Sequence, residues 1–164
     1  MTKPLSVCYF GTYRPDYVRN RVSISGLSKL GVQVHECGSR TAGVAKLWHL
    51  RRRHKTTPAY DAMVVGFPGH QVMPLARIFA RRRKAPVVFD AFTSLYHAMV
   101  QARGTVSPRS WRAGYYFLLD WVSCRMADVV LLDTSAHADY LAELTRLPRD
   151  RFRHLYVGTD IADV

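Results

Sequence analysis

The chain alternates short apolar runs with longer segments in which apolar residues recur every three or four positions. The short runs have the length of strands and end in glycine or polar residues, which is typical of buried parallel strands. They predict strands over residues 5–11, 32–37, 60–67, 85–94, 128–135 and 151–160. The segments between them have helical periodicity and predict helices over residues 16–31, 43–55, 72–84, 107–127 and 135–147.

Local signals support several of these helix boundaries. Asp16 follows Pro15 and is a candidate N-cap, and Pro74 fits the first turn of its helix. Strands that alternate with helices at this spacing imply right-handed crossovers and a parallel sheet covered on both faces. We therefore predict one doubly wound, Rossmann-like, three-layer α/β domain over residues 1–164, with about six or seven mainly parallel strands.

Composition supports a single globular domain. A chain of 164 residues that is 48% apolar can bury one sizeable core. It has neither an apolar run of the ~20 residues needed to span a bilayer nor a secretory signal at its start. Cys8, Cys37 and Cys124 lie in apolar contexts without CxxC spacing, so we expect reduced core thiols and a cytoplasmic location.

The net charge of +12 is unusual for a domain of this size. Its basic residues cluster over 46–55 and 80–86, and such clusters favour an anionic partner, although a solvated arginine-rich surface would give the same counts. In the first cluster, Leu47 and Trp48 accompany the cations, a mixture that is typical of a helix at an anionic membrane surface. The alternative is that these two side chains pack in the core.

Ligands of open α/β sheets bind at the carboxyl ends of the strands. Here those ends are followed by the loops 11–20, 38–43, 66–71, 90–97 and 133–137, which we expect to form one rim. The first loop is unusually polar for a simple connection. We predict that it binds substrate, with Arg14 and Arg19 facing an anion at a helix start. The candidate substrate-binding residues of this loop are Gly11, Tyr13, Arg14, Arg19 and Asn20.

Two further loops carry candidate residues. Asp90 ends an apolar strand and could act with His97 in proton transfer, or could instead cap the next helix. Ser94 lies between them and is a candidate for substrate binding. One strand further on, Thr134 and Ser135 suit a ligand rich in hydroxyls or phosphate, although at least one of them is expected to be a helix cap.

Several common sites have no sequence support. The chain contains no G-x-G-x-x-G after its first strand and no P-loop motif, which argues against an ordinary dinucleotide enzyme or P-loop NTPase. It contains neither paired C-x-x-C motifs nor H-E-x-x-H. We predict no metal and no resident cofactor.

The order of the predicted strands and helices, together with the sequence stretches quoted below, resembles the N-terminal, acceptor-side domain of GT-B fold glycosyltransferases of the retaining family 4 type. The stretch 127–160, "ADVVLLDTSAHADYLAELTRLPRDRFRHLYVGTD", is similar to the end of that domain, with Thr134 where serine is usual and 157–160 matching a closing Gly-Val-Asp. "GLSKLGVQVHEC" and "YDAMVVGF" resemble its helix–strand pair and its next strand. The glycine-rich first loop of the family is replaced by "GTYRPDYVRN", and Asp90 stands where histidine is frequent.

The resemblance implies an enzyme that transfers a sugar from a nucleotide sugar to an acceptor hydroxyl with retention. In it, Asp90, Ser94 and His97 would orient the acceptor, and Arg14 and Arg19 would contact phosphate. The nucleotide sugar is a substrate rather than a cofactor. The partner implied is a C-terminal donor-binding domain or subunit, either deleted or naturally separate, without which we expect the chain to be inactive.

Two other classes stay open. One is a basic α/β module that binds an anionic membrane surface, at the inner face of the membrane, or nucleic acid, without catalysis. Of these two partners, nucleic acid is the less expected. The other is a flavodoxin-like or receiver-like domain, which the absence of a hydroxyl-rich or acidic first loop argues against. The sequence identifies neither the donor sugar nor the acceptor.

Overall fold

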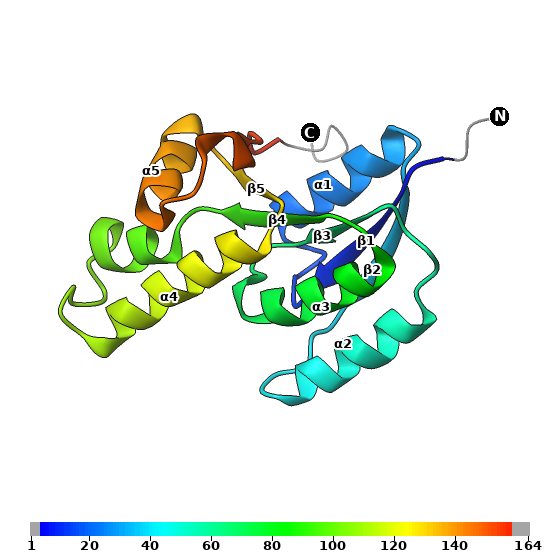
Figure 1. The fold of residues 1–164 in the computed structure, drawn as a ribbon, viewed down its shortest axis with the longest axis horizontal. Coiled ribbons are helices and arrows are strands. Elements are labelled where there is room, and N and C mark those ends of the chain that lie inside the picture. The colour runs from blue at the N-terminus through cyan, green and yellow to red at the C-terminus, as the bar shows by residue number, and fades with distance from the viewer. Residues whose placement is uncertain (1–3, 159–164) are drawn as a thin grey trace.

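Residues 4–158 are described by the structure, a computed structural model, and they form a six-stranded sheet flanked by helices (Figure 1). The strands are β1 (Ser6–Gly11), β2 (Gln33–Gly38), β3 (Ala62–Val65), β4 (Val87–Phe92), β5 (Val129–Leu132) and β6 (Phe152–His154). The helices are α1 (Val18–Lys29), α2 (Ala45–Thr56), α3 (Met73–Arg83), α4 (Trp111–Met126) and α5 (Ser135–Thr145). Short helical turns lie at η1 (His70–Val72), η2 (His97–Ala102) and η3 (Arg149–Arg151).

The strand order is β2-β1-β3-β4-β5-β6, and every neighbouring pair is parallel. This confirms the predicted Rossmann-like α/β fold and its sheet of about six strands. The last strand is shorter than expected, since only Phe152–His154 pair with β5, and the end of the predicted range, 159–160, lies outside the described residues.

The topology distributes the helices unequally between the two faces. The crossover from β1 to β2 runs toward one edge of the sheet, while the four later crossovers run toward the other edge. Because all are right-handed, α1 lies on one face and α2 to α5 lie on the opposite face. In Figure 1, α1 is above the sheet and α2, α3 and α4 are below it.

The main core lies under α2 to α5. Side chains of alternate strand positions, among them Phe10, Met63, Phe89 and Leu132, are fully buried there. The three cysteines are also buried and free, as expected for core thiols.

On the α1 face, the strand side chains are only partly covered. Val64, Val88 and Leu131 are half-buried, and a groove of about 480 Å³ runs between them and α1. Leu30, Leu155 and other apolar side chains at its border are exposed, so the predicted cover on this face is incomplete.

Two boundary expectations are wrong in detail. Asp16 does not cap α1, because Tyr17 occupies the N-cap and makes no side-chain cap bond, while Asp16 pairs with Arg14. The long helix α4 begins at Trp111 rather than near Ser107, because Ser110 Oγ accepts a hydrogen bond from the Ala113 amide. The π-helical turn η2 carries no sequence signal that predicted it.

Within residues 4–158, no helix has the length and apolar character needed to cross a bilayer.

Candidate functional site

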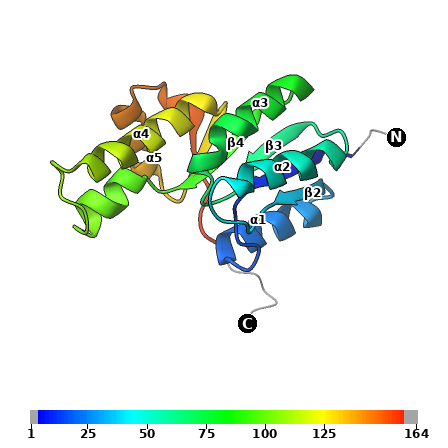
Figure 2. The ribbon, with the colours of Figure 1, turned by 90° about the horizontal axis from the view of Figure 1, so that it is seen from below.

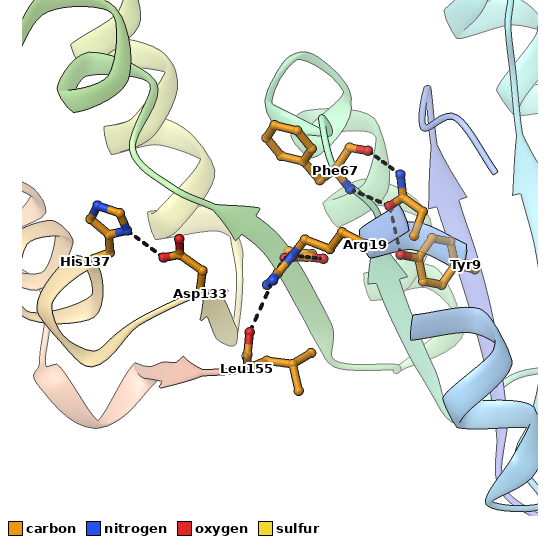
Figure 3. A network of polar contacts seen from close by, with 8 residues as sticks. Tyr9, Arg19, Phe67, Asp133, His137 and Leu155 are labelled. Atoms are coloured by element: carbon orange, nitrogen blue, oxygen red, sulfur yellow. Dashed lines mark hydrogen bonds and ion pairs between the residues drawn. The ribbon is translucent and has the colours of Figure 1, made fainter. Parts of the chain in front are cut away.

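Because the sheet is parallel throughout, the carboxyl ends of its strands and the loops that follow them share one edge. The polar groups on this rim fall into two parts. A basic cleft follows β1 and β2, and an imidazole cluster follows β4 and β5. Buried polar networks lie between and beneath them, and Figure 3 shows the central one.

The first loop is anchored in the interior by Tyr13. Its hydroxyl donates to Glu36 Oε2 at 2.9 Å, and its ring lies so close to Gly38 that a Cβ there would come within 3.2 Å. Burial raises the pKa of Tyr13 above its ordinary value. Gly11, at the end of β1, has a φ of +138°, a conformation that favours glycine. These two predicted substrate-binding residues therefore shape the loop from within.

Arg14 extends from the same loop into solvent, with its guanidinium 2.6 Å from the Asp16 carboxylate. It lines a hollow of about 500 Å³ together with residues of the loop 38–43 and the start of α2. An adjoining hollow of about 510 Å³ is lined by Tyr13, by residues of the loop 38–43 and by His49 and Arg53 of α2. We call this region the basic cleft, and its cations are Arg14, Arg40, Lys46 and Arg53.

Hydroxyl and imidazole groups complete the basic cleft. His49 Nδ1 lies 2.9 Å from Ser39 Oγ, and Arg53 donates to the Gly38 carbonyl at 2.8 Å, which holds the loop against α2. Arg40 and Lys46 were not among the predicted site residues. Both could have been predicted as site residues, because the loop 38–43 was assigned to the rim and α2 starts directly after this loop.

Arg19 was predicted to face an anion of the substrate, but the anion that it meets in the structure is the Asp90 carboxylate of the chain itself. The side chain of Arg19 is 3% exposed, and its Nε donates to both carboxylate oxygens of Asp90 at 2.8 and 2.9 Å. A third bond, from Nη1 to the Leu155 carbonyl at 3.2 Å, ties the segment after β6 to α1 (Figure 3). The guanidinium also lies 4.8 Å from the centre of the Phe92 ring.

Asp90 is correspondingly buried, with its side chain 2% exposed. Burial raises the pKa of Asp90, and the hydrogen bonds and charge of Arg19 oppose that rise. The carboxylate therefore lies under the rim as one half of an ion pair, 71 positions from its partner in the sequence.

Asn20, the neighbour of Arg19, is fully buried and connects three elements. Its Oδ1 accepts from the Tyr9 hydroxyl at 3.0 Å and from the Phe67 amide at 3.1 Å. Its Nδ2 donates to the carbonyls of Phe67 and Arg14 at 2.7 and 3.1 Å. All the hydrogen-bonding capacity of this amide is therefore used to fix the first loop and the loop after β3.

Ser94 belongs to a second buried network. Its hydroxyl donates to Asp120 Oδ2 at 2.7 Å and accepts from the His97 amide at 2.9 Å. Asp120 also accepts from the amides of Leu95 and Tyr96. This aspartate of α4 was not predicted as a site residue, and through Ser94 it positions the turn that carries His97.

The imidazole cluster contains His97 and His137. Their ring centres are 5.4 Å apart, and Tyr140 lies 5.1 Å from His97. His137 Nδ1 is 2.5 Å from Asp133 Oδ1, as Figure 3 shows, so a carboxylate fixes the orientation of this partly exposed ring. His97 Nδ1 lies 3.1 Å from Gln101 Oε1.

Thr134 and Ser135 lie beside this cluster. Thr134 is the N-cap of α5, with its hydroxyl accepting from the His137 amide at 3.2 Å, as the capping alternative anticipated. Ser135 is exposed at the first position of the helix. His137 was missed by the sequence analysis, although its spacing of four from Asp133 across a helix start was a usable signal.

The rim thus brings together His97, Thr134 and Ser135 on one side and Arg14 on the other, while Arg19, Asn20, Asp90 and Ser94 are buried beneath it. Three strand spacings separate β1 from β5, so the two parts lie about 14 Å apart. Among the residues that the structure describes, no group of three or more His, Cys, Asp or Glu side chains could hold a metal ion.

No protein-family model and no curated protein sequence matches the chain. Among solved structures, Anabaena Alr3699/HepE in complex with UDP and glucose superposes with a TM-score of 0.52 at 12% identity, over 96% of this chain and 46% of that protein. The same protein in complex with UDP gives a TM-score of 0.45 at 14% identity, over 98% of this chain and 45% of that one. The first of these comparisons places the chain in the class of Rossmann-like α/β domains. The chain spans about half the length of the structures it matches.

Proposed function

We propose that the chain is the acceptor-side half of a GT-B glycosyltransferase that transfers a sugar from a nucleotide sugar to an acceptor hydroxyl. The observation that carries this is the rim, which combines a basic cleft and a carboxylate-held histidine at the carboxyl ends of parallel strands. Alr3699/HepE, half of which has this fold, binds UDP and glucose. The resemblance of residues 127–160 to family 4 supports the same assignment.

In this proposal, the imidazole cluster orients the acceptor. Asp133 holds His137 in one orientation, so that Nε2 can hydrogen-bond an acceptor hydroxyl as it approaches the sugar. His97 provides a second imidazole beside it, and Ser135 adds an exposed hydroxyl. Asp90, Ser94 and Asp120 are positioning residues, since each lies beneath the surface and acts through Arg19 or through the turn of His97.

The basic cleft is proposed to bind phosphate of the acceptor or of the donor. Arg14, Arg40 and Lys46 supply cations there, and an arginine guanidinium matches the geometry of phosphate oxygens. A separation of about 14 Å between two strands of a sheet is within reach of an extended phosphorylated substrate that also reaches His137. Nucleotide sugar enters as a substrate, and the proposal includes no resident metal or cofactor.

The donor-binding half is proposed to be a second domain or subunit. GT-B sites form between two facing domains, so this rim alone forms one of the two sides of the site. The protein is proposed to work in the cytoplasm.

The experiment compares the purified chain alone with the chain mixed with its donor-binding half, taken from the adjoining coding sequence, over a panel of nucleotide sugars. We expect transfer only in the mixture. His137→Asn should lower transfer about 100-fold, the scale of a misplacement of about 1 Å at the reacting atoms, because the acceptor loses the group that orients it. His35→Asn, in the middle of β2, is the matched control and should leave transfer unchanged. Sugar transfer by the chain alone would contradict the half-enzyme proposal, and equal effects of the two variants would contradict the role of His137.

The stereochemistry of the product tests the family 4 part of the proposal. With retention, the acceptor hydroxyl approaches on the face that the phosphate leaves, and a phosphate oxygen can take its proton. With inversion, the protein must take that proton, and His137 would be its acceptor. We propose retention, so NMR of the first product formed should show the anomeric configuration of the donor. The opposite anomer would reject the family 4 mechanism while leaving the transferase proposal in place.

A further inference from the structure

The outer surfaces of α2, α3 and α4 carry large apolar side chains that do not pack against the domain. Trp48 on α2 is 65% exposed and Trp111 at the start of α4 is 80% exposed. The alternative in which Trp48 packs in the core is therefore wrong. Other apolar side chains on the same helices, or at their ends, are exposed as well: Val44, Ile78, Tyr115 and Leu118. We call the outer surface of these three helices the docking face.

The apolar residues of the docking face follow helical spacing. On α4, Trp111, Tyr115 and Leu118 are at i, i+4 and i+7, which places them on one line along the helix. Val44 and Trp48 are four residues apart at the start of α2. The buried residues of α4, such as Ala113 and Cys124, lie on its opposite side, toward the core.

The docking face is positively charged. On α2 this charge comes from Arg51, Arg52 and Lys55, and α3 ends in the run 81–83. The other two cations of α2, Lys46 and Arg53, belong to the basic cleft. The sole acidic residue of the three helices is Asp120, which is 1% exposed and engaged by Ser94. By contrast, α5 exposes Asp139 and Glu143.

The three helices lie side by side on one side of the sheet. Figure 1 shows them below the strands, and Figure 2, seen from below, shows α2, α3 and α4 next to one another. Gln71 links them at one end, since its Nε2 donates to Tyr115 Oη at 3.3 Å and its Oε1 accepts from Lys46 Nζ. The face is therefore one surface built by three helices.

We propose that the docking face binds the surface of a bilayer that contains anionic lipids. Basic residues would meet the headgroups, and the exposed tryptophans and aliphatic side chains would enter the boundary between headgroups and acyl chains. The sequence alone indicated α2 for this role, and the structure extends the surface to α3 and α4. Binding of this kind does not depend on the glycosyltransferase proposal.

The apolar side chains favour a membrane over nucleic acid. A phosphodiester backbone would be attracted by the arginines, but Val44, Ile78 and Leu118 would gain nothing from it. At a bilayer, each of these side chains leaves water for an apolar environment. The single sign of the charge also fits the negative surface potential of an anionic leaflet.

Membrane contact through the docking face leaves the rim accessible. The rim lies at the edge of the sheet where the strands end, while α2, α3 and α4, which carry the docking face, lie on one side of the sheet (Figures 1 and 2). A protein bound in this way could take an acceptor from the membrane surface at its edge.

Intrinsic fluorescence provides the test, because all three tryptophans of the chain lie on α2 and α4. The chain is titrated with vesicles of phosphatidylcholine alone and with vesicles that also contain phosphatidylglycerol. We expect a blue shift of the emission, and quenching by brominated acyl chains, with the anionic vesicles at low salt. High salt should weaken both effects, because it screens the attraction of the basic residues.

Two variants separate the contributions. Arg51→Glu with Arg82→Glu should lower the partition coefficient at least 25-fold, since each basic residue near an anionic surface contributes about a factor of five. Arg146→Glu with Arg153→Glu makes the same charge change outside the docking face and should have less than a third of that effect. Trp111→Ser should reduce the blue shift and quenching while leaving the far-UV circular dichroism spectrum unchanged.

Four results would overturn the proposal. These are no spectral change with any vesicle, equal binding to neutral and anionic vesicles, equal loss of binding in the two double variants, and a response to duplex DNA in the absence of any response to vesicles.

Discussion

On one face of the sheet, α2 to α5 bury the side chains of the central strands β1, β3, β4 and β5 completely, whereas on the other face α1 leaves Val64, Val88 and Leu131 half-buried. The first face is held mainly by apolar packing, with Asp120 of α4 hydrogen-bonded to Ser94 as a buried polar contact. On the second face, Arg19 of α1 pairs with Asp90 of β4, and Asn20 bonds to Tyr9 of β1 and to Phe67 after β3. On the face that is covered by α1 alone, buried polar contacts therefore attach this helix to the sheet.

The difference matters for the candidate site, because the polar contacts of the α1 face lie directly beneath the rim. Buried ion pairs and amide networks hold their partners in a defined geometry, and they are costly when one member is lost. The α1 face therefore contributes to the positioning of the rim more than its modest apolar burial would suggest.

The largest expected effect comes from breaking the buried ion pair. Arg19→Ala leaves the Asp90 carboxylate without its partner in the interior, which should lower the free energy of unfolding by about 3–5 kcal/mol. Urea denaturation followed by circular dichroism measures this. A double variant, Arg19→Met with Asp90→Leu, removes both charges and should recover most of the loss. If the double variant is no more stable than Arg19→Ala, packing rather than charge pairing explains the effect.

A matched pair of valines on β3 compares the two faces directly. Val65 is fully buried on the side of α2 to α5, and its neighbour Val64 points to the α1 side and is half-buried. Val65→Ala should cost about 2–3 kcal/mol and Val64→Ala about 1 kcal/mol, because the cost follows the area removed from contact and the cavity left behind. Equal values from urea denaturation would mean that the groove beside α1 is closed in solution.

The face under α2 to α5 also contains two buried histidines, His54 and His70, and the first of them gives this face a pH dependence. His54 stacks on Phe79 at 4.3 Å and lies 2.9 Å from the Tyr60 hydroxyl, and burial, followed by the charge of Arg83, lowers the pKa of His54 to about 4. Between about pH 6.5 and 4 the unfolded chain therefore binds this proton and the folded chain does not, so stability falls as the pH falls.

The expected loss from about pH 6.5 to pH 5 is about 2 kcal/mol, since one pKa unit corresponds to 1.36 kcal/mol. His54→Gln should remove this part of the dependence of the free energy of unfolding on pH. His154→Gln changes an exposed residue and should leave that dependence unchanged. If the free energy of unfolding depends on pH in the same way in the wild type and in His54→Gln, other groups account for the acid sensitivity.

Most of the fold could be predicted from the sequence, because strand–helix alternation and the handedness of crossovers leave few topologies. The incomplete α1 face could not be. The face covered by each helix depends on strand order, and the bond between the Leu155 carbonyl and Arg19 of α1 joins residues 136 positions apart.

The candidate site was predicted only in part, and Arg14 and Arg19 show why. Both arginines belong to the same polar stretch, and sequence alone does not reveal that one meets a carboxylate 71 positions away while the other meets Asp16. Rim loops were found because strand ends are visible in the apolar pattern. Side-chain partners across the sheet are not visible there, and they decide which polar residues are buried.

The smallest expected effect on stability comes from the second arginine ion pair, which provides the sharpest contrast with the first. The side chains of Arg14 and Asp16 are 74% and 58% exposed, against 3% and 2% for Arg19 and Asp90, although the shortest nitrogen–oxygen distances are 2.6 and 2.7 Å. Water and salt screen the exposed pair, so Arg14→Ala should leave the urea midpoint unchanged. The same variant should weaken binding of inorganic pyrophosphate to the basic cleft, measured by calorimetry, because one of its cations is lost. Arg146→Ala removes a positive charge far from the basic cleft and should change neither quantity. A shifted urea midpoint with unchanged pyrophosphate binding would show that Arg14, like Arg19, serves the fold rather than a ligand.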